Sequence, residues 1–233
     1  MLTANNYDNP PNVRKLLVLD SSYSLEAIRS RSLEDSVTCR DLEGFFEHVW
    51  SVHPFATLVT SDKWMSKYGR FKFHKLNSSH TFIEGKIGKF KFLQWLPSLN
   101  FLISQIDIFF ALIRLIRKKK INVIRSGDPL YLGLFGLALS RLCGVPLALR
   151  IGANYDKSYE TTGKPRQAKL FQARWIEKIV EQFVFKHADL VAGANQDNLD
   201  FALANGAKPE VSTLFRYGNL IDKQHFVDPQ NVV

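Results

Sequence analysis

The chain has 233 residues, 45% of them hydrophobic, and a net charge of +9, which suits one large α/β domain or two small ones. Its two cysteines, Cys39 and Cys143, show no metal-like spacing with histidine, so the sequence argues against a disulfide scaffold and a zinc module. Residues 1–11 are polar and do not resemble a signal peptide. We therefore expect a cytoplasmic protein with reduced thiols.

The first half of the chain begins with an apolar run at 15–20, which predicts a buried first strand. Residues 21–40 are polar and charged and predict a long irregular segment. Asp41 is a suitable helix cap, and we expect a helix from there to residue 50. Two further strands are predicted at 56–60 and 71–76.

Basic residues concentrate between positions 63 and 120. This region contains 13 Lys or Arg residues and only two acidic residues, Glu84 and Asp107. A solvated, lysine-rich edge strand is one explanation of this positive charge. The alternatives are contact with anionic lipid headgroups, with nucleic acid or with an anionic acceptor. No nucleic-acid-binding signature accompanies the basic residues, so we expect no nucleic-acid partner. The candidate residues of a membrane face are Lys72, Lys89, Lys91, Arg117, Lys118, Lys119 and Lys120.

Residues 93–116 are strongly apolar, but Pro97, Asn100, Gln105 and Asp107 interrupt the run. The segment therefore does not predict a membrane-spanning helix. Helical spacing instead predicts an amphipathic helix, and we expect it to pack into the core rather than insert into a membrane interface. The expected inward positions are 102, 106, 109, 110, 113 and 116.

The second half alternates short apolar strands with helices. Asp128 and Gly144 are suitable signals for the start and end of a buried helix, at 129–143. Strands are expected at 121–125, 145–151, 189–192 and 211–215, and further helices at 165–187 and 196–205. This alternation predicts an α/β, Rossmann-like fold with a mostly parallel sheet and helices on both faces.

Ligands in such a sheet bind outside the carboxyl ends of the strands, so the loops that follow the strands are the candidate site. Capping or turn formation explains several of these residues equally well, as for Asp128, Asn195 and Asn219. The candidates are Ser21, Ser126, Asp128, Arg150, Gly152, Asn154, Asp156, Asn195, Arg216 and Asn219.

The chain lacks the glycine motifs of dinucleotide-binding and P-loop proteins, and it has no HExxH or GxSxG motif. We therefore expect no cofactor and no bound metal.

The second half of the chain, about residues 121–229, resembles the N-terminal domain of glycosyltransferase family 4, the group 1 enzymes with the two-domain GT-B fold. The match is strongest at 177–226. HADLVAGANQDNLDFALANGA resembles that family's strand and helix, and PEVSTLFRYGNLIDKQHF its interdomain linker, with Asn219, Asp222 and Phe226 at the matching spacing. The resemblance implies that 1–217 form the N-terminal, acceptor-side domain and that 218–233 begin the linker. A C-terminal donor-binding domain is then absent from this sequence.

The resemblance implies a retaining, hexosyltransferase-type enzyme of cell-surface polysaccharide or glycolipid synthesis. A nucleotide sugar would be the donor substrate and a glycan or lipid-linked intermediate the acceptor, at the inner face of the plasma membrane. The chain departs from the family at Ser21 to Ser24, where a Gly-Gly pair is usual, and at Gly152 to Asn154, where many members have a histidine. No catalytic residue is assigned, and this chain alone is expected to be inactive. A non-catalytic adaptor for membranes or polyanions is the alternative.

Overall fold

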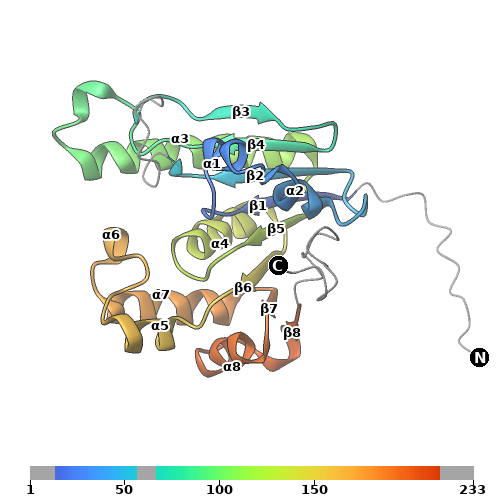
Figure 1. Cartoon of the computed structure of the whole chain (residues 1–233), viewed down its shortest axis with the longest axis vertical. Helices are drawn as coiled ribbons and strands as arrows, with labels where there is room; N and C mark the ends of the chain where they lie inside the picture. The colour runs from blue at the N-terminus through green and yellow to red at the C-terminus, as the bar shows by residue number, and fades with distance from the viewer. Residues whose placement is uncertain (1–13, 57–66, 216–233) are drawn as a thin grey trace, which may run out of the picture.

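The computed structural model describes residues 14–56 and 67–215. Its strands form one eight-stranded sheet in the order β3-β4-β2-β1-β5-β6-β7-β8 (Figure 1), in which only the pairing of β3 with β4 is antiparallel. The strands are β1 Lys15–Leu19, β2 His48–His53, β3 Lys72–Lys75, β4 His80–Glu84, β5 Val123–Ser126, β6 Leu147–Ile151, β7 Leu190–Gly193 and β8 Ser212–Leu214.

Helices pack on both faces of the sheet, as the sequence predicted. The larger core cluster contains side chains of α3, α4 and α7, and a smaller one joins α1 and α2 to Phe82 of β4. The α-helices are α1 Leu25–Ser30, α2 Glu34–Thr38, α3 Pro97–Lys119, α4 Tyr131–Cys143, α5 Tyr155–Thr162, α6 Ala168–Phe171, α7 Arg174–His187 and α8 Gln196–Ala204. Single 3-10 turns are η1 Cys39–Asp41, η3 Lys91–Leu93 and η4 Pro209–Val211.

The region before residue 56 differs from the sequence prediction. Residues 21–40 are not irregular, because α1 and α2 lie there. The helix predicted from Asp41 to residue 50 is wrong, since β2 begins at His48 and pairs with both β1 and β4. Val49 and Trp50 are both buried although they point to opposite faces of the sheet, so the segment lacks the polar face of a surface helix.

The predicted strand at 71–76 is confirmed as β3, and the sequence analysis missed β4, its antiparallel partner. The predicted strand at 56–60 lies almost entirely outside the described residues. The second half follows the prediction closely: the strands and the buried helix α4 are confirmed, and Gly144 ends α4 in the left-handed conformation, with φ of 67°. The helix predicted at 165–187 is instead two helices, α6 and α7, because the chain turns at Gln172, whose φ is 62°.

The amphipathic helix is confirmed as α3. Of the positions assigned to the core, Ile113 and Ile116 are buried and Phe109 packs against the core, but the other three are exposed. Leu102, Ile106 and Phe110 are 54%, 46% and 53% exposed. Polar residues point inward instead, because this part of the helix packs against loop backbone. The Asn100 side chain accepts hydrogen bonds from the amides of Lys89 and Phe90, at 2.8 and 3.0 Å.

Candidate functional site

The carboxyl edge of the sheet contains a switch point between β1 and β5. From there the chain order runs toward β2 on one side and toward β6 on the other. Open α/β sheets bind ligands in the crevice at such a point. Asp20 follows β1, and the Gly127 amide donates a 3.0 Å hydrogen bond to the carbonyl oxygen of Leu19. The turns that follow β1 and β5 therefore lie side by side.

The Asp20 carboxylate is held by residues from two segments. It forms an ion pair with Arg40 and accepts hydrogen bonds from the Ser22 amide at 2.8 Å and the Ser22 hydroxyl at 2.6 Å. Burial acts to raise the pKa of Asp20, but Arg40 and Ser22 outweigh it and hold that pKa below its usual value. Arg40 also donates a 3.0 Å hydrogen bond to the Ser51 hydroxyl. Asp20 thus presents a fixed, ionised carboxylate at the switch point.

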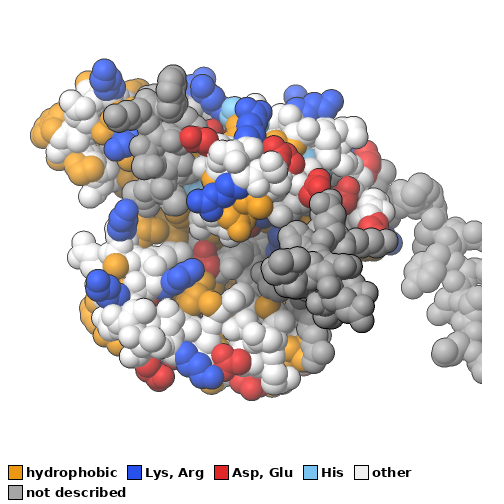
Figure 2. All heavy atoms as spheres, viewed as in Figure 1, with side chains coloured by type: hydrophobic (Ala, Val, Ile, Leu, Met, Phe, Trp, Pro, Cys, Tyr) orange, Lys and Arg blue, Asp and Glu red, His pale blue; other side chains and the backbone are white. Residues whose placement is uncertain are grey.

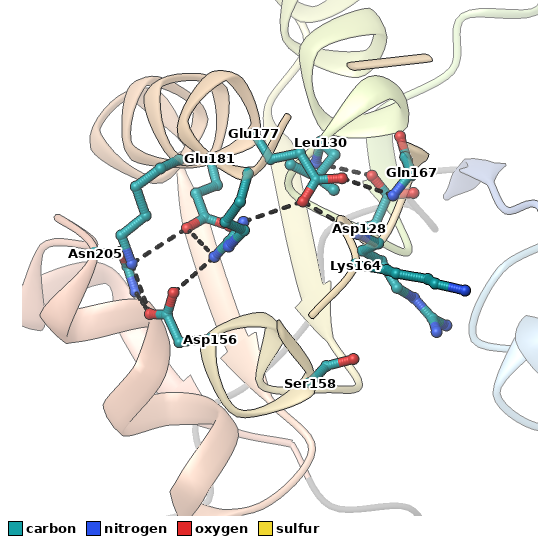
Figure 3. A network of polar contacts seen from close by, with 12 residues as sticks. Asp128, Leu130, Asp156, Ser158, Lys164, Gln167, Glu177, Glu181 and Asn205 are labelled. Atoms are coloured by element: carbon teal, nitrogen blue, oxygen red, sulfur yellow. Dashed lines mark hydrogen bonds and ion pairs between the residues drawn. The ribbon is translucent and has the colours of Figure 1, made fainter. Parts of the chain in front are cut away.

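Asp128 is buried on the other side of the switch point. Its carboxylate accepts a 2.8 Å hydrogen bond from the Leu130 amide (Figure 3), and its backbone carbonyl accepts one of 2.9 Å from the Ser126 hydroxyl. Burial raises the pKa of Asp128 to about 6, and the nearby negative charge of Asp20 contributes to the increase. The helix predicted to begin at Pro129 begins at Tyr131 with Leu130 at its N-cap, so Asp128 does not cap it. Asp128 instead provides a carboxyl group that titrates near neutral pH.

His53 stands at the end of β2, close enough to Asp20 for that carboxylate to influence the pKa of the imidazole. Its ring is fully buried, and burial lowers the pKa of His53 to about 4 despite the opposing effect of Asp20. The imidazole is thus neutral at pH 7. Sequence reasoning missed both His53 and Arg40 as site residues, although the position of His53 just before Pro54, at the end of an apolar run, was an available signal.

Among the other candidates, Asn154 and Asp156 follow β6 and already have partners. Asn154 caps α5, accepting a 3.2 Å hydrogen bond from the Lys157 amide. Asp156 forms ion pairs with Arg174 at 2.7 Å and with Lys178 at 2.6 Å. These contacts hold α5 against neighbouring helices.

Arg174 joins several carboxylates into one polar network, and Figure 3 labels three of them, Asp156, Glu177 and Glu181. Of these, Glu177 at 3.3 Å and Glu181 at 2.8 Å are fully buried. Glu177 in turn accepts hydrogen bonds from the amides of Arg166, at 3.2 Å, and Gln167, at 2.6 Å. Gln167 contributes a side-chain hydrogen bond to Asp128. The network therefore fixes the loop that borders Asp128.

The remaining candidates do not converge on the switch point. Arg150 lies on a face of β6, with its guanidinium 5.5 Å from the centre of the Phe215 ring. Asn195 caps α8, accepting a 2.9 Å hydrogen bond from the Asn198 amide, and Gly152 lies in an exposed loop. Ser21 neighbours Asp20, but Ser22 makes the contacts there. Arg216 and Asn219, with the linker proposed at 218–233, lie outside the described residues.

The membrane-face candidates form separate groups. Lys89 pairs with Asp107 at 2.8 Å, close to Lys91 in η3, whereas Arg117, Lys118 and Lys119 occupy the last turn of α3 and Lys120 caps it. A helix of 23 residues is about 35 Å long. Lys89 and Lys91 thus lie beside the first half of α3 and the other group at its C-terminal end, and Lys72 lies apart from both on the edge strand β3. Within residues 14–56 and 67–215 we found no cluster of three or more His, Cys, Asp or Glu residues suited to a metal ion.

Comparisons with known proteins support the fold. Neither a family model nor a curated protein sequence matches the chain. Among solved structures, HepE of Anabaena in complex with UDP-glucose is similar to this chain, with 12% sequence identity and a TM-score of 0.51. The superposition covers 88% of this chain and 44% of the HepE chain. A structure of sucrose-phosphate synthase from Thermosynechococcus elongatus has 11% sequence identity and a TM-score of 0.51. That superposition covers 89% of this chain and 91% of the synthase chain in the structure.

These structural neighbours are glycosyltransferases of the GT-B fold, and the likeness shows that this chain has the corresponding Rossmann-like fold. The chain spans about half the length of HepE. A UDP-N-acetylglucosamine 2-epimerase superposes with a TM-score of 0.48 and 13% identity, over 88% of this chain and 48% of its own.

Proposed function

We propose that this chain is the acceptor-side part of a retaining, hexosyltransferase-type glycosyltransferase of family 4. The observation that carries the proposal is the superposition of 88% of the chain on less than half of HepE, whose structure contains UDP-glucose. The family 4 assignment draws on the sequence pattern of 121–229, strongest at 177–226, and the acceptor in this proposal is a cell-surface glycan or a lipid-linked intermediate.

Within the proposal, the switch point is where the acceptor meets the donor sugar. Transfer of a glycosyl group develops positive charge on the sugar and negative charge on the leaving diphosphate, so fixed charges matter more than a protein nucleophile. Asp20 and Arg40 are a preformed charge pair at that place, and Asp128 is a carboxyl group whose pKa lies near neutrality. A nucleotide sugar is the donor substrate, held mainly by a second domain.

Titration of the isotope-labelled chain with UDP-glucose, followed by backbone amide NMR, tests this assignment. We expect weak binding, because this chain contacts only part of the donor, but the amides of 20–22 and 126–128 should shift and Asp20→Asn should reduce those shifts. Asp200→Asn, at an exposed position of α8, is the matched control and should leave them unchanged. Shifts confined to other regions would contradict the proposed site. Sugar transfer by this chain alone would contradict the assignment to one half of an enzyme.

We also propose that the protein binds peripherally to the inner face of the plasma membrane through α3. Leu99, Leu102, Ile106 and Phe110 form an exposed stripe at helical spacing, and Phe92 and Trp95 precede it, 70% and 72% exposed. Figure 2 shows hydrophobic side chains gathered where η3 and the start of α3 lie. α3 is long and apolar enough to span a membrane, with a third of its most apolar window buried. Its basic C-terminal end, with Arg117, Lys118 and Lys119, suits a helix lying in an anionic interface.

The exposed stripe also favours the second candidate function, a non-catalytic membrane adaptor. Vesicle binding with no response of the switch-point amides to any nucleotide sugar would favour that adaptor over the transferase.

A further inference from the structure

A groove lies between the outer surfaces of α4 and α7. Each of these helices returns from the carboxyl end of one parallel strand to the amino end of the next, so the two helices are parallel. The Arg141 guanidinium donates a hydrogen bond to the His187 carbonyl oxygen and ties their last turns together. The groove has a volume of about 300 Å³, and the residues that line it are Leu134, Leu137, Ala138, Arg141, Phe183 and His187.

α7 presents an apolar stripe beside this groove. Trp175, Ile179 and Phe183 follow one another at intervals of four residues, which places them on one face of the helix, and they are 66%, 59% and 48% exposed. α4 adds Leu134 and Leu142, 39% and 55% exposed. Large apolar side chains gathered on two neighbouring helices mark an interaction surface, since single exposed apolar residues are the ordinary case.

The charged residues of the same part of α7 are turned away from the stripe. Glu177 and Glu181 are fully buried, and the Lys178 ammonium group pairs with Asp156 at 2.6 Å and with Glu181 at 3.4 Å. The centre of the stripe is therefore aromatic and aliphatic. Depletion of charge and enrichment of aromatic residues are typical of the buried core of a protein interface.

We propose that this surface pairs with the same surface of a second copy of the chain. A two-fold dimer uses one patch on both copies, and this patch contains both a protruding side chain and a groove. With antiparallel α7 helices and the axis beside Ile179, Trp175 of one copy reaches Phe183 of the other, because both lie four positions from Ile179. The indole thus enters the groove that Phe183 borders. Lys186 then lies opposite Gln172, so no like charges are opposed.

The size of the surface predicts weak association. α7 has 14 residues and is about 21 Å long, and packed helices lie about 8–10 Å apart. The two helices therefore present a flat area of roughly 400 Å² on each copy. Interfaces of this size belong to transient complexes, and we expect a dissociation constant on the order of 10–100 µM. The chain is a monomer well below that concentration, where vesicle binding through α3 is measured without this contact.

Sedimentation velocity of the full chain, at concentrations on either side of that value, tests the proposal. We expect wild type to change from monomer to dimer, and Trp175→Glu and Phe183→Lys each to weaken association at least about tenfold. An acidic group near the start of α7 and a basic one near its end suit the helix dipole, so neither change disfavours the helix.

A mixture of the two variants is the sharpest measurement. The introduced carboxylate then meets the introduced ammonium group at one contact, and the native pair of Trp175 and Phe183 is kept at the other. We expect the mixture to associate although each variant alone does not. Phe73→Glu is the matched control, because Phe73 is 53% exposed on β3, at the far edge of the sheet from β6 and β7, and it should dimerise as wild type does.

Circular dichroism checks that every variant is folded. A wild-type chain that stays monomeric at the highest concentration would overturn the proposal, and so would a mixture that does not associate. Loss of vesicle binding in monomeric Trp175→Glu would assign the surface to a membrane instead, and would equally overturn it. No nucleotide sugar is present, so these outcomes are independent of the transferase test.

Discussion

The hydroxyl group of Ser104 donates a 2.7 Å hydrogen bond to the carbonyl oxygen of Lys86, and both residues are buried. One turn earlier, Asn100 binds the backbone of Phe90 through both its carbonyl and its amide group, at 3.0 and 2.6 Å. One turn of α3 thus supplies the polar groups that the loop after β4 needs. The position of Lys86 depends on these contacts.

Ser104→Ala is expected to destabilise the fold by about 1–3 kcal/mol, because the Lys86 carbonyl group would be left buried without its partner. Ser98→Ala on the same helix is the matched control, since Ser98 is exposed, and it should change stability by less than about 0.5 kcal/mol. Urea unfolding of both variants measures the difference. Equal stabilities would show that the hydrogen bond contributes nothing.

The helix α3 shows what periodicity can and cannot predict. Its existence and the core contacts of its second half follow from the sequence. The inward face of its first half does not, because Asn100, Ser104 and Gln105 are buried against loop backbone that only the folded chain brings to them. Apolar spacing alone therefore assigned the exposed residues Leu102 and Ile106 to the core. The alternating strands and helices of the second half were predictable because each of those elements packs an apolar surface on the sheet.

The candidate site was predictable only in part. The residues that follow β1 and β5 were located correctly, since carboxyl ends of parallel strands share an edge. Arg40 was not, because it lies 20 residues from Asp20 in a segment without a strand pattern.

The double substitution Leu102→Gln and Ile106→Gln tests the proposed membrane face. Each side chain is about half exposed, so we expect little loss of stability. Binding to anionic vesicles should fall at least tenfold, because burying a leucine or isoleucine contributes about 1.5–3 kcal/mol. Ile179→Gln on α7, where the isoleucine is 59% exposed, is the control and should bind as wild type does. Vesicle sedimentation measures binding. An equal loss of binding in the control would contradict the proposal that α3 is the membrane-binding face.

Arg174→Met is expected to cost about 3–5 kcal/mol of stability, because it leaves the buried Glu177 without its cation and Glu181 with Lys178 alone, at 3.4 Å. Arg141→Met is the control. Arg141 pairs with Asp189 at 3.6 Å in an exposed position, and the loss of such a pair costs less than about 1 kcal/mol. Denaturant unfolding compares the two variants. If both lose the same stability, the network does not hold the loop beside Asp128.

Asp128→Asn should make stability less dependent on pH. The pKa of Asp128 is raised from 3.8 to about 6 on folding, so the folded chain keeps a proton that the unfolded chain releases near pH 4. This contribution is fully present below pH 4 and is lost as pH rises through 6, a change of about 3 kcal/mol. Asparagine does not titrate, and all other groups are shared by the two proteins.

The free energy of unfolding of wild type minus that of Asp128→Asn should therefore decrease between pH 4 and pH 7. Urea unfolding at several pH values measures this difference. A difference that stays constant, or that increases with pH, would show that the Asp128 carboxyl group ionises without penalty in the folded protein. Such a result would also contradict the proposal that Asp128 exchanges protons near neutral pH at the switch point.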